Sequence, residues 1–376
     1  MQKIGILGGG QLGRMLLQVA ANYPVITYVL ENDPDCPAAH LCHHFIKGDI
    51  RNFDDVYKFG CELDSITIEI ESVNEEALEQ LEKEGVKIYP KTRALKIIKH
   101  KILQKQFYVD NEIPTAPFHI TGCLADLTKY SGLLPAMHKV SKGGFDGRGV
   151  IPIKTVSDFE KGFDEPAVLE KSIDIIKEIS IIIAVGNDGK TAIYPAVEMM
   201  FDPRLNLLNY QLSPARLDEK VLWKIEAIAL RVVKCLDSPG LFAVELFVDH
   251  ENNIWVNETA PRVHNSGHHT IESNYSSQFD MLWRIMLNYP LGNTRHILPS
   301  AIVNLVGSPN HSGSARYKGI ENILKLDNVF LHLYGKTLTK PGRKMGHVTI
   351  LSSEPQELIH TALKIKEQLT VISESQ

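Results

Sequence analysis

Residues 257–268 read Asn-Glu-Thr-Ala-Pro-Arg-Val-His-Asn-Ser-Gly-His, and they continue from a short apolar run, Ile254–Val256. The stretch carries a carboxylate, a guanidinium, amides, hydroxyls and imidazoles in close succession. Such a variety of polar groups in one loop after a strand is typical of a substrate pocket. A serine–histidine hydrolase is an alternative, but the chain contains no Gly-x-Ser-x-Gly turn that would expose a nucleophilic serine.

A β-hairpin is predicted immediately before this loop, because two apolar runs flank the polar turn 250–253. If the strands pair symmetrically about the middle of that turn, Glu245 lies opposite Glu258. Like charges about 5 Å apart on one sheet face are destabilising. The pair therefore favours a hard cation, and Mg²⁺ with substrate phosphates fits, with Asn257 adding a neutral oxygen. The alternative is a register slipped by one residue, which turns the glutamates to water.

A glycine-rich stretch, Gly143–Gly149, reads Gly-Gly-Phe-Asp-Gly-Arg-Gly. Its glycines favour a flexible flap whose N–H groups can surround anionic oxygens. Asp146 and Arg148 add charges that a purely structural turn, which is the alternative, does not require. The stretch lacks the Lys-Ser/Thr ending of a P-loop. Lys139, on a short predicted strand just before it, could pair with a phosphate.

The first 90 residues alternate predicted strands with predicted helices, which indicates a parallel, doubly wound α/β sheet. The strand predicted at Lys3–Leu7 leads into Gly8–Gly13, which has the Gly-x-Gly-x-x-Gly spacing and opens a helix. In a dinucleotide-binding fold this turn would hold phosphates and Glu31 would hold a ribose. The alternative is a turn that uses glycine for steric reasons alone.

The rest of the chain predicts further strands, helices and a basic turn. Residues 92–111 predict one long helix, and the chain is expected to end in a helix within a closing unit at 297–376. Predicted strands cover 167–170, 178–185 and 192–198, and a helix covers 220–236. The turn Lys340–His347 concentrates cations in an acidic protein, which indicates phosphate or carboxylate binding.

Composition excludes several classes of protein. Hydrophobic residues make up 44% of 376 residues, which is typical of a globular chain of two or three domains. The net charge of −5 argues against a broad nucleic-acid surface. No run approaches the length of a spanning helix, and the N-terminal residues are not expected to form a secretory signal. Five scattered cysteines without a Cys-x-x-Cys pair predict reduced thiols in a cytoplasmic protein, and the segment Cys36–His44 does not match a standard zinc spacing.

Together these motifs resemble the ATP-grasp superfamily and, within it, the N5-carboxyaminoimidazole ribonucleotide synthetase family of purine biosynthesis. The resemblance covers nearly the whole chain and is carried by residues 10–15, 114–117, 143–149, 257–268 and 341–347. The run Arg262–His268 is the most specific part, because other ATP-grasp ligases do not carry it as such. The resemblance implies a Rossmann-like domain at 1–95, a small α+β lid at 96–168 and a larger α+β domain at 169–376 that includes the unit 297–376.

The resemblance implies that ATP lies between the lid and the larger domain. Lys101 and Lys139 would contact its phosphates, and Glu245 and Glu258 would hold Mg²⁺, which agrees with the hairpin argument. The implied nucleotide-binding residues are Lys101, Lys139, Gly143, Gly144, Phe145, Asp146, Gly147, Arg148, Gly149, Glu170, Lys171, Ser172, Ile173, Glu178, Glu198, Asn257 and Glu258. Phe145 stands where the flap of the family usually carries tyrosine.

The resemblance also implies a site for aminoimidazole ribonucleotide and bicarbonate, and it reassigns the first glycine turn to ribonucleotide binding. The implied substrate-binding residues are Gln11, Glu71, Arg262, Asn265, Ser266, Arg343 and Lys344. The expected catalytic residues are Asp146, Arg148, Arg262 and Lys344. Of these, Asp146 and Lys344 are expected to place bicarbonate and to direct protons.

The reaction implied by the resemblance converts ATP and bicarbonate into carboxyphosphate, which releases CO₂ beside the amine of the ribonucleotide. The amine then captures CO₂ as a carbamate, leaving ADP and phosphate. The expected partners are these small molecules and a second copy of the chain in a homodimer. Three alternatives stay open: a formate-dependent ribonucleotide transformylase, an NAD-dependent dehydrogenase that leaves Glu245 and Glu258 without a purpose, and a non-catalytic nucleotide-binding module.

Overall fold

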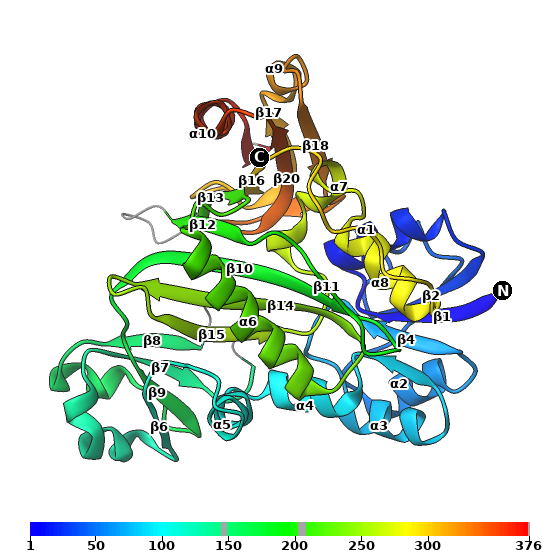
Figure 1. The fold of residues 1–376 in the computed structure, drawn as a ribbon. Helices are drawn as coiled ribbons and strands as arrows, with labels where there is room; N and C mark the ends of the chain where they lie inside the picture. The colour runs from blue at the N-terminus through cyan, green and yellow to red at the C-terminus, as the bar shows by residue number, and fades with distance from the viewer. Residues whose placement is uncertain (144–148, 202–207, 375–376) are drawn as a thin grey trace.

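The computed structural model describes residues 1–143, 149–201 and 208–374, and within these ranges the strands form four sheets (Figure 1). The N-terminal sheet and its helices lie at one side, a long twisted sheet crosses the centre, and a smaller sheet lies at the other side. The C-terminal unit extends the central sheet at its far end. The flap residues Gly144, Phe145, Asp146, Gly147 and Arg148 lie outside the described residues.

The N-terminal sheet is parallel with strand order β3-β2-β1-β4-β5, as the alternation of strands and helices predicts. Its strands are β1 (Gln2–Leu7), β2 (Val25–Glu31), β3 (His44–Lys47), β4 (Ser65–Ile68) and β5 (Lys87–Tyr89). Ile4 and Ile6 pack with α1 (Gln11–Ala20) on one face. On the opposite face Leu7 packs with α2 (Phe53–Gly60) and α3 (Glu75–Lys83). Apolar residues on both faces bury the sheet between helices.

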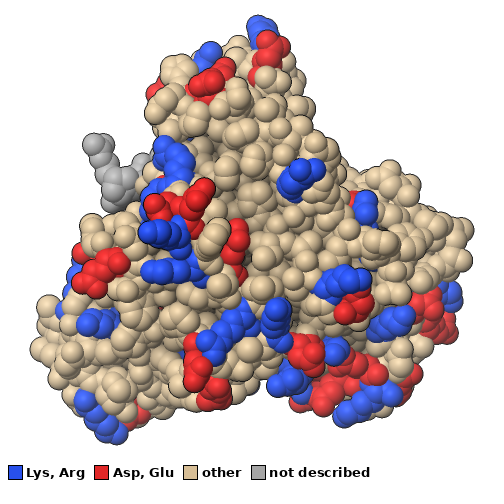
Figure 2. Space-filling view, in the orientation of Figure 1, with Lys and Arg blue, Asp and Glu red and all other residues tan. Residues whose placement is uncertain are grey.

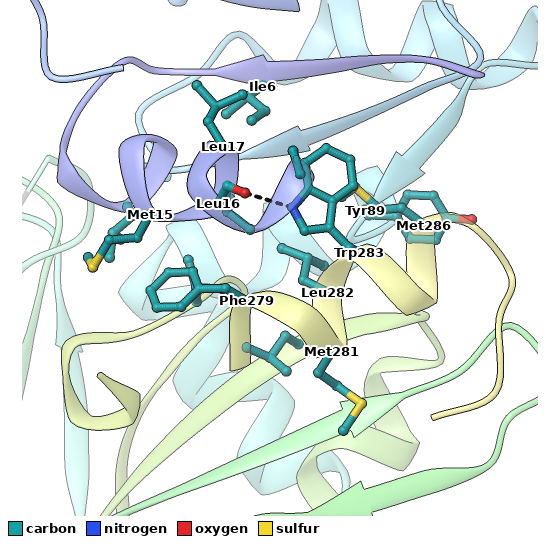
Figure 3. Packing of buried hydrophobic residues seen from close by; sticks show 14 of the residues in the cluster. Ile6, Met15, Leu16, Leu17, Tyr89, Phe279, Met281, Leu282, Trp283 and Met286 are labelled. Atoms are coloured by element: carbon teal, nitrogen blue, oxygen red, sulfur yellow. Dashed lines mark hydrogen bonds between the residues drawn. The ribbon is translucent and has the colours of Figure 1, made fainter. Parts of the chain in front are cut away.

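The N-terminal sheet is joined to the central sheet through α8 (Gln278–Met286), which lies between α1 and the central sheet. Figure 3 shows Trp283 of α8 directed at α1, where its indole Nε1 donates a 2.8 Å hydrogen bond to the carbonyl of Leu16. Trp283 is fully buried. A buried indole with its N–H satisfied contributes both a large apolar area and a fixed orientation. The contact therefore sets how the glycine turn before α1 faces the rest of the chain.

Within the described residues the central sheet has nine strands and is antiparallel, in the order β15-β14-β10-β12-β13-β16-β20-β18, with β11 beside β10. Its strands are β10 (Ile175–Val185), β11 (Thr191–Ile193), β12 (Val197–Phe201), β13 (Leu208–Ser213), β14 (Gly240–Asp249), β15 (Ile254–Ala260), β16 (Ser300–Val306), β18 (Val329–Leu333) and β20 (Lys344–Leu351). One face packs on α6 (Glu219–Leu236), and part of the other packs on α8. The strand predicted at 192–198 is interrupted between β11 and β12.

The closing unit shares the central sheet through β16, β18 and β20. It adds α9 (Ile320–Ile323), α10 (Pro355–Gln368) and a small sheet in which β17 (Gly313–Lys318) lies between β19 (Leu338–Thr339) and β21 (Thr370–Ser373). The expectation that the chain ends in a helix is wrong, because β21 follows α10 and pairs with β17. Apolar side chains of α10 and β20 pack in one cluster, which anchors the unit.

The lid sheet has the order β6-β9-β7-β8, formed by β6 (Phe118–Thr121), β7 (Ala136–Val140), β8 (Val150–Ile153) and β9 (Ala167–Lys171). The short 3-10 helices η1 (Leu124–Leu133) and η2 (Val156–Lys161) cover its apolar face. The helix predicted at 92–111 is two helices, α4 (Thr92–Lys99) and α5 (Lys101–Asp110). His100 is extended between them, and the Lys101 N–H bonds to Ser141 of the lid at 2.9 Å. A tertiary contact thus overrides a helical pattern.

The surface carries acidic and basic side chains interspersed over the face shown in Figure 2. Within the part of the chain that the structure describes, no helix is long and apolar enough to cross a membrane.

The five cysteines are free. In the segment weighed for a metal, His43 bonds to Thr27 and the ring of His44 stacks on Tyr28.

Buried histidines lie between the motif loop and the closing unit. The His347 ring stacks on His332 with centroids 4.5 Å apart and lies 4.8 Å from His268, while Tyr334 bonds to His347 Nδ1 at 3.0 Å. Burial lowers the pKa of His268 and His347 well below the usual range and that of His269 to about 4. These imidazoles are therefore neutral in the folded state.

We expect acid to destabilise the fold through these histidines. The pKa of His269 is about 4 when folded and about 6.5 when unfolded, so its contribution is complete above pH 6.5 and is lost as the pH falls toward 4. His269→Phe should therefore reduce the loss of stability between pH 7 and pH 5 by about 2 kcal/mol, measured by urea unfolding. The exposed His360→Gln is the control, and equal pH dependence of wild type and His269→Phe would contradict the assignment.

Candidate active site

Two glutamates face each other across β14 and β15, and the predicted pairing of Glu245 with Glu258 is confirmed. The strand register differs from the one expected. Near the turn Val248 pairs with Ile254, and this register, if continued, would place Asn257 opposite Glu245. A β-bulge at Asn257 shifts the pairing by one residue and brings Glu258 opposite Glu245.

The two carboxylates differ in their electrostatic surroundings. Desolvation and the charges of Glu258 and Glu178 raise the pKa of Glu245 to about 8. Desolvation also opposes ionisation of Glu258, but Lys101 at 3.2 Å and Lys139 outweigh it and lower the pKa of that carboxyl. Glu178 lies on the same face, and desolvation raises its pKa to about 7. Burial thus favours the protonated forms of Glu245 and Glu178, whereas the lysines keep Glu258 ionised.

This donor set fits Mg²⁺ as a partial ligand shell. Across residues 1–143, 149–201 and 208–374, no group of three or more His, Cys, Asp and Glu side chains is arranged to hold a metal by itself. Mg²⁺ usually takes one or two carboxylates and keeps waters and substrate phosphates as its other ligands. The opposed pair Glu245 and Glu258 therefore suits a cation that arrives with a phosphate-bearing ligand.

Behind Glu245 lies a chain of polar side chains from the motif loop. His264 Nε2 lies 3.5 Å from Glu245 Oε1, and its Nδ1 lies 2.9 Å from the hydroxyl of Ser266. Ser266 lies in η3 (Asn265–Gly267) and bonds to Ser180 of β10 at 2.7 Å. Because Ser266 is only 1% exposed, it supports His264 from behind, which differs from the substrate contact expected of it. Asn265 is partly exposed at the start of η3.

A narrow pocket beside this pair gathers the cations expected to bind phosphate. Lys101 begins α5, Lys139 lies on β7 and Glu170 lies on β9, and all three line it together with Asn257 and Glu258. Lys139 Nζ contacts Glu170 at 3.2 Å and the Asn257 amide oxygen at 3.1 Å. A larger hollow of about 320 Å³ lies beside α2 and is lined by none of the expected residues. Chemistry, and not cavity size, marks the site.

The other expected nucleotide-binding residues differ in the sheet face on which they lie and in their exposure. Glu178 shares the face of Glu245, whereas Glu198 pairs with Ile179 and lies on the opposite face. Glu198 is buried there and accepts hydrogen bonds from Lys177 at 2.6 Å and from the Arg216 N–H at 3.2 Å. The segment Lys171, Ser172 and Ile173 connects the lid to β10 and is exposed or partly exposed.

The glycine turn before α1 is filled by the chain's own carboxylates. Glu69 accepts hydrogen bonds from the N–H groups of Leu12 and Gly13, both at 3.1 Å, and Glu31 accepts one from Gly9 at 3.0 Å. A dinucleotide fold would place phosphate at these N–H groups and ribose at Glu31. The geometry therefore disfavours the NAD-dependent dehydrogenase, and desolvation raises the pKa of Glu69.

Two expected substrate residues bind each other. Arg262 Nε lies 2.9 Å from Glu71 Oε1, and a second guanidinium nitrogen donates to Glu71 Oε2 at 3.3 Å. This bidentate pair joins the loop after β4 to the motif loop. Lys344 acts on Glu245 by charge and partly offsets its raised pKa. Arg343 donates to the Leu338 carbonyl at 2.7 Å and Gln11 is partly exposed at the start of α1.

Sequence reasoning missed four residues near the site: Glu69, Lys105, His264 and Lys336. Lys336 donates to the Lys344 carbonyl at 2.8 Å, and its charge offsets a small part of the rise in the pKa of Glu69 that desolvation causes. His264 stood in the quoted motif, but the other three carry no local signal because each lies far in sequence from its partners. Only the folded chain brings Lys336 to Glu69.

Three family models match consecutive parts of the chain. They are the ribonucleotide synthetase preATP-grasp domain at residues 1–99, the ATP-grasp domain at 106–279 and the phosphoribosylaminoimidazole carboxylase C-terminal domain at 300–361. The N5-carboxyaminoimidazole ribonucleotide synthase of Staphylococcus epidermidis is 32% identical over 368 residues, covering 93% of this chain and 92% of that protein. The chain belongs to the N5-carboxyaminoimidazole ribonucleotide synthase family.

Solved structures of this family share the fold. The N5-carboxyaminoimidazole ribonucleotide synthetase of Thermotoga maritima is 35% identical with a TM-score of 0.93, covering 100% of both chains. The Aspergillus clavatus synthase in complex with ADP and 5-aminoimidazole ribonucleotide is 30% identical with a TM-score of 0.87, covering 97% of this chain and 98% of that one. The predicted ATP-grasp fold is confirmed.

Some members of the wider family are longer. The chloroplastic phosphoribosylaminoimidazole carboxylase of Vigna aconitifolia is 34% identical and matches 93% of this chain. The chain spans only 64% of the length of that relative. It thus corresponds to part of the plant protein and to nearly the full length of the Staphylococcus epidermidis protein.

We expect binding of Mg²⁺ to compete with a proton on Glu245. The folded pKa of about 8 lies above the ordinary 4.5, so this group costs the metal-free protein stability as the pH rises from 4.5 to 8. Apparent Mg²⁺ affinity, measured by calorimetry with ADP present, should therefore fall about tenfold per pH unit below pH 8. Glu245→Gln should abolish this pH dependence, whereas Glu251→Gln in the turn should keep it. Identical Mg²⁺ titrations for wild type and Glu245→Gln would refute the ligand assignment.

We expect the Glu69 carboxylate to be the reason for glycine at position 10. A Cβ on Gly10 would lie 2.4 Å from Glu69 Oε1, whereas one on Gly132 would meet nothing within 4 Å. Gly10→Ala should lose about 2 kcal/mol of unfolding free energy, and Gly132→Ala should lose much less. In a Glu69→Ala background the Gly10→Ala penalty should largely vanish. A penalty unchanged in that background would place the cause elsewhere.

Proposed function

We propose that the chain catalyses the ATP-dependent carboxylation of 5-aminoimidazole ribonucleotide with bicarbonate to N5-carboxyaminoimidazole ribonucleotide, with release of ADP and phosphate. The observation that carries the proposal is the opposed pair Glu245 and Glu258 beside Lys101 and Lys139, within a chain of this family. The two carboxylates favour binding of a cation that carries phosphate ligands, and the lysines supply positive charge for those phosphates.

In this proposal the nucleotide binds at the pocket between the lid and β15. Lys101 and Lys139 contact its phosphates, and Glu245 and Glu258 hold Mg²⁺. When bound there, Mg²⁺ supplies charge neutralisation at the phosphate oxygens. Because ammonium groups keep a fixed positive charge close to the reacting phosphate, they stabilise the charge that develops during transfer.

The proposed chemistry has two stages. A bicarbonate oxygen bonds to the γ-phosphorus of ATP while the bond to the ADP oxygen breaks, which gives carboxyphosphate. The carboxyphosphate C–O bond then breaks to give CO₂ and phosphate, the amine nitrogen bonds to the CO₂ carbon, and its proton passes to phosphate. Exclusion of water protects the labile intermediate. Arg262 and Lys344, with Asp146 and Arg148 beyond the described residues, are the proposed catalytic groups.

The ribonucleotide is proposed to bind between the glycine turn and the loop 340–347. Because Glu69 and Glu31 already occupy the N–H groups of the turn, the ribonucleotide phosphate requires side-chain cations. Lys336 acts by its charge on Glu69 at the glycine turn, Arg343 lies within the loop 340–347, and Gln11 opens α1. The paired Arg262 and Glu71 offer a donor and an acceptor to the aminoimidazole.

Further parts of the proposal rest on the family resemblance alone. These are a homodimer, a cytoplasmic location, and the division into domains at residues 95 and 168. Each stays a prediction.

ADP release from purified protein tests the reaction. With ATP and Mg²⁺, ADP should form rapidly only when 5-aminoimidazole ribonucleotide and bicarbonate are both present. Glu258→Gln should lower kcat by about a hundredfold or more with an unchanged circular dichroism spectrum. Turnover that needs formate in place of bicarbonate would favour the transformylase. ADP binding without turnover under either condition would leave a nucleotide-binding module.

A further inference from the structure

A lysine that no motif indicates lies buried behind the nucleotide pocket. Lys105 of α5 is 3% exposed, and its Nζ lies 2.5 Å from the Thr115 hydroxyl and 2.9 Å from Glu170 Oε2. Glu170 is equally buried, and the same oxygen lies 3.2 Å from Lys139 Nζ. Thr115 in turn donates to the Val256 carbonyl beside the β-bulge. Lys105 thus contacts β9 of the lid sheet directly and β15 through Thr115.

Lys105 and Lys139 together carry one positive charge more than Glu170 balances, and this excess positive charge lies at the pocket. A buried carboxylate needs a counter-ion, because leaving it unpaired costs several kcal/mol. Two ammonium groups flank Glu170, one deep and one at the pocket wall. If Lys105 neutralises Glu170, the charge of Lys139 is left over for an incoming phosphate. Without Lys105, Glu170 would hold Lys139 as its sole counter-ion.

We propose that Lys105 is a positioning residue for nucleotide binding: its ammonium neutralises Glu170 and so leaves Lys139 directed at the nucleotide phosphates. The inference rests on the proposed function only in that a nucleotide binds at this pocket. It assigns the Glu170 side chain the role of a buried counter-ion, in place of the direct nucleotide contact expected from the resemblance.

The electrostatics of the pocket give this arrangement a pH dependence. Desolvation lowers the pKa of Lys105 to about 8, and the charge of Glu170 offsets part of that effect. The charged groups that face it are Glu170 from β9, Lys139 from β7 and Lys101 from its own helix, with the Tyr108 ring 6.0 Å away. Above pH 8 Lys105 loses its proton, Glu170 draws on Lys139 alone, and nucleotide affinity falls.

The test measures ADP binding by calorimetry between pH 7 and pH 9.5. At pH 7, Lys105→Met should weaken ADP binding about tenfold while the KM for the ribonucleotide stays near the wild-type value. Wild-type affinity should fall above pH 8 toward that of Lys105→Met. Lys105→Arg keeps its charge throughout this range, so its ADP affinity should not fall above pH 8.

The double variant Lys105→Met/Glu170→Gln separates positioning from a merely structural role. It removes both buried charges, so Lys139 is free of competition and ADP affinity should recover toward wild type at every pH. Wild-type ADP affinity in Lys105→Met, or no recovery in the double variant, would overturn the proposal. If Lys105→Met does not fold, the wild-type and Lys105→Arg pH profiles decide, and equal decline in both overturns it. ADP binding without carboxylation would refute the proposed function and leave this inference standing.

Discussion

Two carboxylates on adjoining strands, Glu245 and Glu258, impose the constraint on which the arrangement of the site depends. They repel each other across the strand pair, and desolvation raises the pKa of Glu245 to about 8. The positive charge near them comes from four separate segments: α5 and the lid supply Lys101 and Lys139, and the motif loop and the closing unit supply His264 and Lys344. Because these segments converge on one pair of carboxylates, the lid and the central sheet share a single electrostatic centre.

In the N-terminal sheet, by contrast, the charges of the chain balance one another without a ligand. There the anion that a helix N-terminus attracts is supplied by the chain itself, since Glu69 accepts from Leu12 and Gly13. A site that is already satisfied internally has little affinity left for a phosphate. At β14 and β15 the charges of Glu245 and Glu258 are not balanced within the chain, so a bound cation would balance them. Glu170 is the intermediate case, in which one lysine satisfies the carboxylate and a second remains for the ligand.

Local patterns in the sequence predict those parts of the structure that depend on interactions between residues close together in the chain. The parallel sheet, the hairpin and the polar loop follow from periodicity, turn residues and composition. The occupant of the glycine turn could not be predicted, because Glu69 lies far along the chain from the N–H groups it binds. The break at His100 depends on a bond to the lid, and the burial of Glu198 on the sheet face opposite Glu245 depends on strand register. Each of these is fixed by a tertiary contact that a single sequence does not display.

The β-bulge at Asn257 shows how such a contact can nonetheless be forced by the sequence. A regular register would place Glu258 opposite Val244, on the apolar face that packs against α6. Burying an unpaired carboxylate there costs several kcal/mol, whereas a bulge gives up roughly one ladder hydrogen bond, or about 1 kcal/mol. The bulge is therefore the cheaper solution even without a ligand. It turns Glu258 into the cleft and lets the inserted Asn257 bind Lys139. The carboxylate pair therefore forms because the regular register would bury the Glu258 carboxylate in the apolar core.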